Sequence, residues 1–226
     1  MRRLTVSQPL RLGMREMSEN NKLGGKIKNV IFDFGQVLVH FVPEYMVRQY
    51  VSCEEDVKLL SEVVFDRLYW DKLDAGTITD NEVVSACLER LPERLHSATE
   101  KIYYNWIYNI PEIEGMEDVV KKLKNNPEVR LFLLSNISNY FADHAKEISI
   151  LSLFDKCFFS ARLGMVKPHA DIFDHLLRDR NIKAEETVFI DDSPKNINGA
   201  EAVGIEGYLF DGNVKKLKEY LKPLLK

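Results

Sequence analysis

The sequence predicts an α/β fold built on a parallel β-sheet, and two observations lead to this prediction. Short, continuous apolar runs recur along the chain, and longer segments with helical periodicity lie between them. Continuous apolar runs are typical of strands that are covered on both faces. Helical segments between such strands are typical of right-handed crossovers into a parallel sheet. With 226 residues, 45% of them hydrophobic, the chain is long enough to build the core that this fold needs.

The apolar runs are the strand candidates. They lie at residues 29–32, 129–134, 156–159, 187–190 and 207–210. The long interval between the first two contains no convincing strand, and its apolar residues fall at helical spacing, as at Val83, Val84 and Cys87. We therefore expect a helical cap domain at residues 41–112, inserted into a core domain formed by residues 27–40 and 113–226.

The first 26 residues are rich in basic side chains and end in a polar stretch that contains glycine. We expect a leader outside the fold, and three interpretations stay open. The leader is an unstructured tail, a start assigned too early with Met14 or Met17 as the true initiator, or a basic targeting segment.

Composition excludes some classes of partner. A formal net charge of -4 argues against nucleic acid, because proteins that bind the phosphate backbone are usually strongly basic. No apolar run approaches the roughly 18 residues that cross a bilayer. Cys53, Cys87 and Cys157 are far apart and show no metal-ligand spacing, which suits a reducing compartment. We expect a cytoplasmic monomer or homodimer that binds a small molecule, and neither nucleic acid nor a membrane.

Reactive polar residues follow three of the predicted strands directly. In chain order they are Asp33, the pair Ser135 and Asn136, and the pair Asp191 and Asp192. The carboxyl ends of parallel strands meet at one edge of the sheet, where ligands bind. Lys167, followed by a proline, comes after the run at 156–159 and could reach the same edge from its loop. The sequence therefore predicts one site formed by residues far apart in the chain.

Phosphoryl chemistry explains why these residue types occur together. A carboxylate attacks a phosphate dianion poorly unless cations cancel the repulsion between them. Asp33, Asp192 and Asp191 could supply the oxygen ligands that Mg²⁺ prefers. Lys167 could hold both Asp33 and the phosphoryl group, and the hydroxyl of Ser135 could bind its other oxygens.

These residues resemble the motifs of the haloacid dehalogenase superfamily. The matching segments are residues 30–38, 134–136, 167–168 and 189–193. The turn at residues 74–79 looks like that of the branch with bacterial alpha-glucose-1-phosphate phosphatase and the N-terminal phosphatase domain of mammalian soluble epoxide hydrolase. The resemblance implies a Rossmann-like core with a helical cap after its first strand. It also implies hydrolysis of small phosphorylated metabolites, above all sugar phosphates, through an aspartyl-phosphate intermediate.

The resemblance also implies a role for each residue. Asp33 is the nucleophile, Lys167 neutralises charge and contacts substrate, and Ser135 and Asn136 bind substrate. Mg²⁺ is held by Asp33, the backbone carbonyl of Gly35, Asp192 and, as an alternate or outer ligand, Asp191. Aromatic residues of the cap could include one that faces a sugar. The candidates are Tyr69, Trp70, Tyr103, Tyr104 and Trp106.

Gly35 departs from the pattern of the superfamily. Most of its phosphatases carry a second Asp here, which protonates the leaving alkoxide and later deprotonates water. Glycine cannot do so, although the branch named above also carries glycine. General acid–base catalysis contributes about 100- to 10,000-fold. His40, just beyond the first strand, is a candidate replacement because an imidazole moves protons near neutral pH.

Two alternative functions stay open. A metal-independent dehalogenase also lacks the second Asp, but the acid pair Asp191 and Asp192 favours a metal. A regulatory or binding protein of this fold with low activity is the other alternative, and Gly35 is the residue that motivates it.

Overall fold

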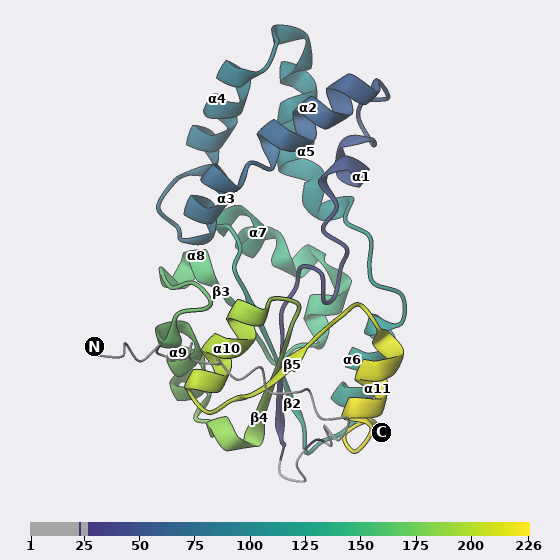
Figure 1. Ribbon diagram of the computed structural model, residues 1–226, viewed down its shortest axis with the longest axis vertical. Helices are drawn as coiled ribbons and strands as arrows, with labels where there is room; N and C mark the ends of the chain where they lie inside the picture. The colour runs from purple at the N-terminus through teal and green to yellow at the C-terminus, as the bar shows by residue number, and fades with distance from the viewer. Residues whose placement is uncertain (1–22, 24–26) are drawn as a thin grey trace, which may run out of the picture.

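The computed structural model describes Leu23 and residues 27–226. Apart from Leu23, the leader predicted at residues 1–26 lies outside the described residues. Figure 1 shows the molecule as a sheet flanked by helices, with a second group of helices above the carboxyl ends of the strands.

One parallel sheet forms the centre of the core. Its strands are β1 (Asn29–Phe32), β2 (Arg130–Ser135), β3 (Lys156–Phe159), β4 (Thr187–Asp191) and β5 (Glu206–Leu209). Their order in the sheet is β3-β2-β1-β4-β5, and every neighbouring pair is parallel. The predicted strands are confirmed to within one residue at each end, and so is the α/β fold with a helical insertion after the first strand.

The two edge strands differ from the prediction that every strand is covered on both faces. All residues of β1 and β4 are buried, whereas β3 and β5 are partly exposed. An edge strand has a neighbour on one side only, so its partly polar sequence can face solvent. In β5, Tyr208 is half-buried and packs on Tyr220, with ring centroids 4.4 Å apart.

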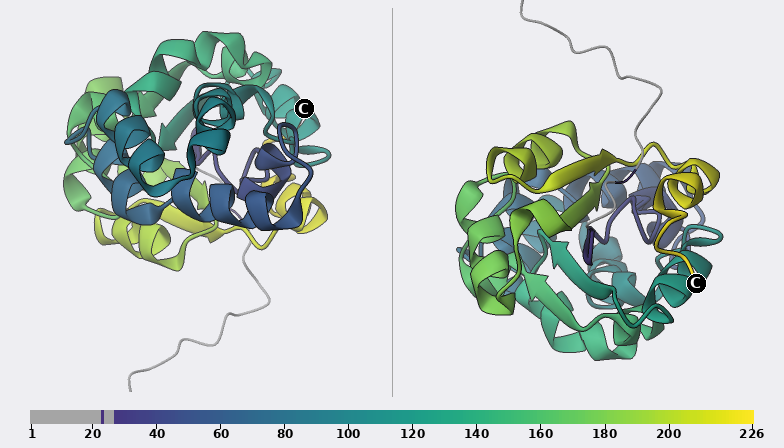
Figure 2. Two further views of the ribbon diagram at one scale, coloured as in Figure 1. Left: turned by 90° about the horizontal axis from the view of Figure 1, so that it is seen from above. Right: turned by 90° about the horizontal axis from the view of Figure 1, so that it is seen from below.

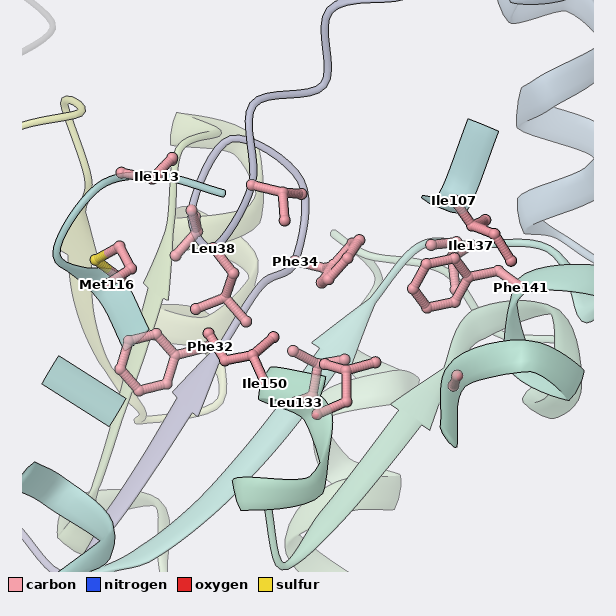
Figure 3. Close-up of a cluster of buried hydrophobic side chains, with 14 of the residues drawn as sticks. Phe32, Phe34, Leu38, Ile107, Ile113, Met116, Leu133, Ile137, Phe141 and Ile150 are labelled. Atoms are coloured by element: carbon pink, nitrogen blue, oxygen red, sulfur yellow. The ribbon is translucent and has the colours of Figure 1, made fainter. Parts of the chain in front are cut away.

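Helices cover both faces of the sheet, as the views in Figure 2 show. The helices of the core are α6 (Met116–Lys124), α7 (Asn139–His144), α8 (Ser160–Leu163), α9 (Ala170–Arg180), α10 (Pro194–Ala202) and α11 (Val214–Leu221). Because successive strand residues point to opposite faces, Ile31 packs with α9 and α10, whereas Phe32 packs with α6. Figure 3 shows Phe32, Leu133 and Met116 in the second of these layers.

The interval after β1 is helical, as predicted. It contains α1 (Pro43–Val47), α2 (Glu54–Val64), α3 (Arg67–Asp74), α4 (Asp80–Arg90) and α5 (His96–Asn105), with short 3₁₀ turns at Glu93–Leu95 and Trp106–Tyr108. Local signals set these bounds: the side chain of Asp66 accepts a hydrogen bond from the backbone of Leu68 at the start of α3, and Thr79 and Glu82 form a capping box at the start of α4. None of the described helices is long and apolar enough to cross a membrane.

Among the contacts between the inserted helices and the core, two bear directly on the position of the site. In the first, the two connecting segments run side by side, since the backbone N–H of His40 donates to the carbonyl of Pro111 at 2.7 Å. In the second, the hydroxyl of Ser160 donates to the backbone carbonyl of Asp74 at 2.5 Å. Next to it, Gly76 has φ +69°, and a Cβ there would lie 2.6 Å from the carbonyl oxygen of Ala161. Only glycine permits this approach of α3 to α8.

Candidate active site

Of the polar residues predicted at the strand ends, Asp33, Ser135, Asn136 and Asp192 line one cavity of about 630 Å³, whereas Asp191 is fully buried and does not line it. Asp33 follows β1, Ser135 ends β2, and Asp192 follows the last residue of β4. Lys167 reaches the cavity from the loop before α9. Beside Asp33, the ring of Phe34 packs on Phe141 with centroids 4.9 Å apart, which anchors the turn that carries Asp33.

Lys167 lies at the centre of the charged groups. Its Nζ is 2.8 Å from Oδ1 of Asp33 and 2.7 Å from Oδ2 of Asp191, and its side chain is 1% exposed. Burial alone would lower the pKa of Lys167, but the two carboxylates hold it above its ordinary value. The ammonium therefore stays charged beside Asp33.

Asn136 fixes the position of Lys167. Its side-chain amide donates to the carbonyl of Lys167 at 2.9 Å, and its Oδ1 accepts from the backbone N–H of Lys167 at 2.8 Å. Sequence reasoning assigned Asn136 to the substrate. Its side chain lines the cavity, but these two bonds use it to hold the loop of Lys167.

Asp191 and Asp192 have different surroundings although they are adjacent. The carboxylate of Asp191 is fully buried and accepts bonds from Lys167, the backbone N–H of Ser193 and the amide of Asn196. Asp192 is exposed and lines the cavity, and no described residue donates a hydrogen bond to its carboxylate. Asp192 is thus free to bind a ligand, whereas Asp191 is already held by the protein.

The acidic residues fit a divalent cation. One carboxylate oxygen from each of Asp33, Asp191 and Asp192 lies within 4.8 Å of the others. Among the described residues, Lys167 is the one cation bonded to this cluster, so its three ionised carboxylates outweigh the single positive charge and only Asp192 has no cationic partner. Burial raises the pKa of Asp33 to about 7, against the opposing effect of Lys167. A divalent cation would supply the missing charge and keep Asp33 ionised.

Ser135 and Gly35 also border the cavity. The hydroxyl of Ser135 makes no hydrogen bond with a described residue, so its O–H is available to donate to an oxygen of a ligand. A Cβ built on Gly35 would meet nothing within 4 Å, so open space lies above its backbone.

His40 lies elsewhere. It borders a separate surface depression with Ile113, Glu114 and Asp211, and is not among the residues that line the cavity of Asp33. The structure therefore does not bring the predicted acid–base candidate together with the nucleophile candidate.

Comparison with known proteins identifies the family. Residues 30–209, from β1 to β5, match the family described as haloacid dehalogenase-like hydrolases. The chain belongs to this family. The match spans the five strands and the inserted helices. It therefore includes both the polar residues at the strand ends and the residues of the inserted helices that line the cavity.

Two curated relatives of this hydrolase are phosphatases. D-ribitol-5-phosphate phosphatase of Bacteroides thetaiotaomicron is 23% identical over 80% of this chain and 91% of its own. Sesquiterpene phosphatase astK of Aspergillus oryzae is 26% identical over 80% of this chain and 88% of its own.

Solved structures of the family share the fold. A HAD-like hydrolase of Porphyromonas gingivalis has a TM-score of 0.64, at 26% identity over 87% of this chain and 98% of its own. A HAD family enzyme of B. thetaiotaomicron, in complex with magnesium and inorganic phosphate, has a TM-score of 0.62 at 21% identity over 83% and 96%. A dehalogenase has a TM-score of 0.66 at 16% identity over 84% and 87%. The last two structures share so little sequence with this chain that their similarity to it concerns the fold alone.

The inserted helices of the hydrolase and the connection that leads into them contribute residues that sequence reasoning missed. They are Phe41, Arg67, Asp71 and Asp74, which line the cavity with Trp70 and Trp106. Of the five aromatic candidates, only these two tryptophans border it. The helical period of α3 could have placed Arg67, Trp70, Asp71 and Asp74 on one face, since they follow i, i+3, i+4 and i+7 spacing.

Proposed function

We propose that the protein is a Mg²⁺-dependent phosphomonoesterase that forms an aspartyl-phosphate at Asp33. The observation that carries the proposal is the position of Lys167, within hydrogen-bond distance of Asp33 and Asp191 beside the unpaired carboxylate of Asp192. This arrangement suits a reaction in which a carboxylate must approach a phosphate dianion.

Each residue has a distinct part in the proposed reaction. Asp33 attacks phosphorus in line with the leaving oxygen, while Lys167 and the hydroxyl of Ser135 bind the non-bridging oxygens. Asp33, Asp192 and the carbonyl of Gly35 would hold Mg²⁺, with Asp191 as an alternate or outer ligand. The bound ion supplies positive charge that lets two anions meet.

We propose small hydroxylated phosphomonoesters, such as polyol and sugar phosphates, as substrates. Trp70 and Trp106 are only 6% and 3% exposed, because their rings pack on each other at 5.3 Å. Apolar and polar atoms line the cavity to similar extents, which suits a compact, partly polar substrate better than a long hydrocarbon chain. The cavity also has charged groups from Arg67 and Asp71, which can bind hydroxyls. The D-ribitol-5-phosphate phosphatase is accordingly the better guide to substrate than the sesquiterpene phosphatase.

We also propose the boundaries of the two domains and the branch of the family to which the protein belongs. A core of residues 27–40 and 113–226 and a cap of residues 41–112 agree with the helices that lie between β1 and α6. The turn at residues 74–79 and the glycine at position 35 support the glucose-1-phosphate phosphatase branch. Free cysteines at positions 53, 87 and 157 support a reducing compartment such as the cytoplasm.

A substrate panel tests the function. Purified protein with Mg²⁺ should hydrolyse p-nitrophenyl phosphate and a subset of polyol and sugar phosphates, and a chelator should stop both reactions. Asp33→Asn should abolish turnover while leaving Mg²⁺ binding measurable. Halide release from a 2-haloacid in the presence of chelator would instead support the dehalogenase alternative. Protein that binds Mg²⁺ or beryllofluoride without turning over any ester would support the regulatory alternative.

A further inference from the structure

Asp74 is a buried carboxyl group that the proposed reaction has not yet used. It is the last residue of α3, its side chain lines the cavity, and it is 7% exposed. No described residue donates a hydrogen bond to its carboxylate oxygens. Asp71, one turn earlier on the same helix, also lines the cavity but is exposed and forms an ion pair with Arg67.

The position of Asp74 is unfavourable for stability. A buried carboxylate without a hydrogen-bond donor is costly, and the carboxyl end of a helix carries partial negative charge that repels it. The contact of α3 with the core uses the backbone carbonyl of Asp74, which accepts from Ser160. Asparagine would make that contact equally well, so the structure by itself gives no reason for a carboxyl here.

Burial brings the pKa of Asp74 close to neutral pH, and the neighbouring charges act on it in both directions. Burial raises the pKa of Asp74 to about 7. Arg67 and Lys167 lower the pKa, whereas Asp71 and Asp33 raise it. Asp192 and Lys195 also face the cavity. A carboxyl group in this range can donate a proton and accept one at neutral pH.

We propose that Asp74 is the general acid–base residue of this enzyme, and this inference rests on the proposed phosphatase function. Gly35 leaves open space beside the nucleophile, and Asp74 supplies from the inserted helices a carboxyl group to the same cavity. It lies outside the cluster of Asp33, Asp191 and Asp192 that fits the cation. Its contact with Ser160 and the close approach at Gly76 hold it against the core.

Asp74 can serve both half-reactions, because it gives up its proton in the first and regains one in the second. In the first, an oxygen of Asp33 bonds to phosphorus and the bond from phosphorus to the leaving oxygen breaks. The leaving oxygen takes the proton of Asp74 and departs as an alcohol, so Asp74 becomes a carboxylate. In the second, that carboxylate takes a proton from water while the water oxygen bonds to phosphorus. The bond to Asp33 breaks, inorganic phosphate leaves, and Asp74 is again protonated.

A leaving-group series tests this role in the full-length protein with Mg²⁺. Phenyl phosphate and p-nitrophenyl phosphate are similar in shape, but the phenoxide of the first needs a proton far more than nitrophenoxide. Asp74→Asn should lower kcat/KM for phenyl phosphate about 100-fold or more and change that for p-nitrophenyl phosphate much less. Asp74→Glu should restore part of the rate with phenyl phosphate. The wild-type kcat/KM for phenyl phosphate should fall above about pH 7, where Asp74 loses the proton that it donates. This alkaline limb of the pH profile should disappear in Asp74→Asn.

Asp71→Asn is the matched control, because it removes a carboxylate from the same helix and the same cavity. It should keep the alkaline limb, moved to lower pH because Asp71 raises the pKa of Asp74, and should change both rates by the same factor at pH values below that limb. If Asp74→Asn also slows both esters equally and keeps the limb near pH 7, Asp74 does not transfer the proton. Thermal unfolding at pH 8 separates this result from misfolding, since Asp74→Asn should unfold no earlier than wild type. If the wild type hydrolyses neither ester, the phosphatase function itself fails, and the role of Asp74 falls with it.

Discussion

The ammonium of Lys167 lies 2.8 Å from Oδ1 of Asp33, and both groups are buried at the floor of the cavity. The same ammonium binds Asp191 at 2.7 Å, so one lysine holds two carboxylates. Their charge exceeds that of the lysine, which is the electrostatic basis for a cation at this site and for the predictions that follow.

Replacing Lys167 by methionine should abolish turnover and destabilise the protein. Removal of one partner from a buried ion pair costs about 3–5 kcal/mol, because the other charge stays buried without compensation. Denaturant unfolding at pH 7.5 measures the loss. Lys195→Met is the control, since Lys195 lines the same cavity but makes no ion pair with a described residue. Equal stability of the two variants would contradict the central position of Lys167.

Mg²⁺ should raise the unfolding temperature of the wild type. A ligand that binds only the native state at 100 times its Kd adds about 2.7 kcal/mol. Asp192→Asn should lose most of this shift, because Asp192 is the carboxylate of the cluster that no described residue binds. Asp71→Asn also removes a carboxylate from the cavity, but it should keep the rise in unfolding temperature that Mg²⁺ causes. Differential scanning fluorimetry across a Mg²⁺ titration makes the comparison, and an unchanged shift in Asp192→Asn would exclude this residue as a ligand.

The stability gained by Asp74→Asn should depend on pH. The pKa of Asp74 is raised from 3.8 to about 7 in the native state, mainly by burial. Below pH 4 both the native and the unfolded protein keep this proton, and the group has no effect. Between about pH 4 and 7 the unfolded chain loses the proton more readily, so wild-type stability falls as the pH rises. The variant should therefore match wild type near pH 4 and exceed it by up to about 4 kcal/mol at pH 8. Urea unfolding at both pH values checks this, and an equal difference at both would contradict it.

Gly76→Ala should weaken the contact between α3 and α8. A non-glycine residue at positive φ costs about 1–2 kcal/mol, and the added Cβ would also lie 2.6 Å from the carbonyl oxygen of Ala161. Gly164→Ala is the matched control, because Gly164 has φ +62° but open space around the new Cβ. The difference between the two losses of unfolding free energy reports the clash alone. We expect Gly76→Ala to lose more stability and also to lower kcat, since Asp74 lies two residues away.

Much of the core of the site was predictable because its determinants are local. Each apolar run marks a strand, and Asp33, Ser135 and Asp191 lie at strand ends. Parallel pairing then brings such residues to one edge without knowledge of other contacts. His40 shows the limit of this reasoning: it follows the same strand as Asp33, but the chain beyond β1 turns away, and its side chain borders another depression.

The strands, the fold class and the charged residues at the carboxyl edge of the sheet follow from the amino-acid sequence alone, since periodicity and strand-end position are properties of short segments. Three features follow from the packing of the whole chain instead: which strands lie at the edges, the hold of Asn136 on the backbone of Lys167, and the entry of Asp74 into the cavity. The contact between Asp74 and Ser160 joins residues 86 positions apart. Such contacts depend on how the inserted helices pack on the core, and no local pattern in the chain specifies that packing.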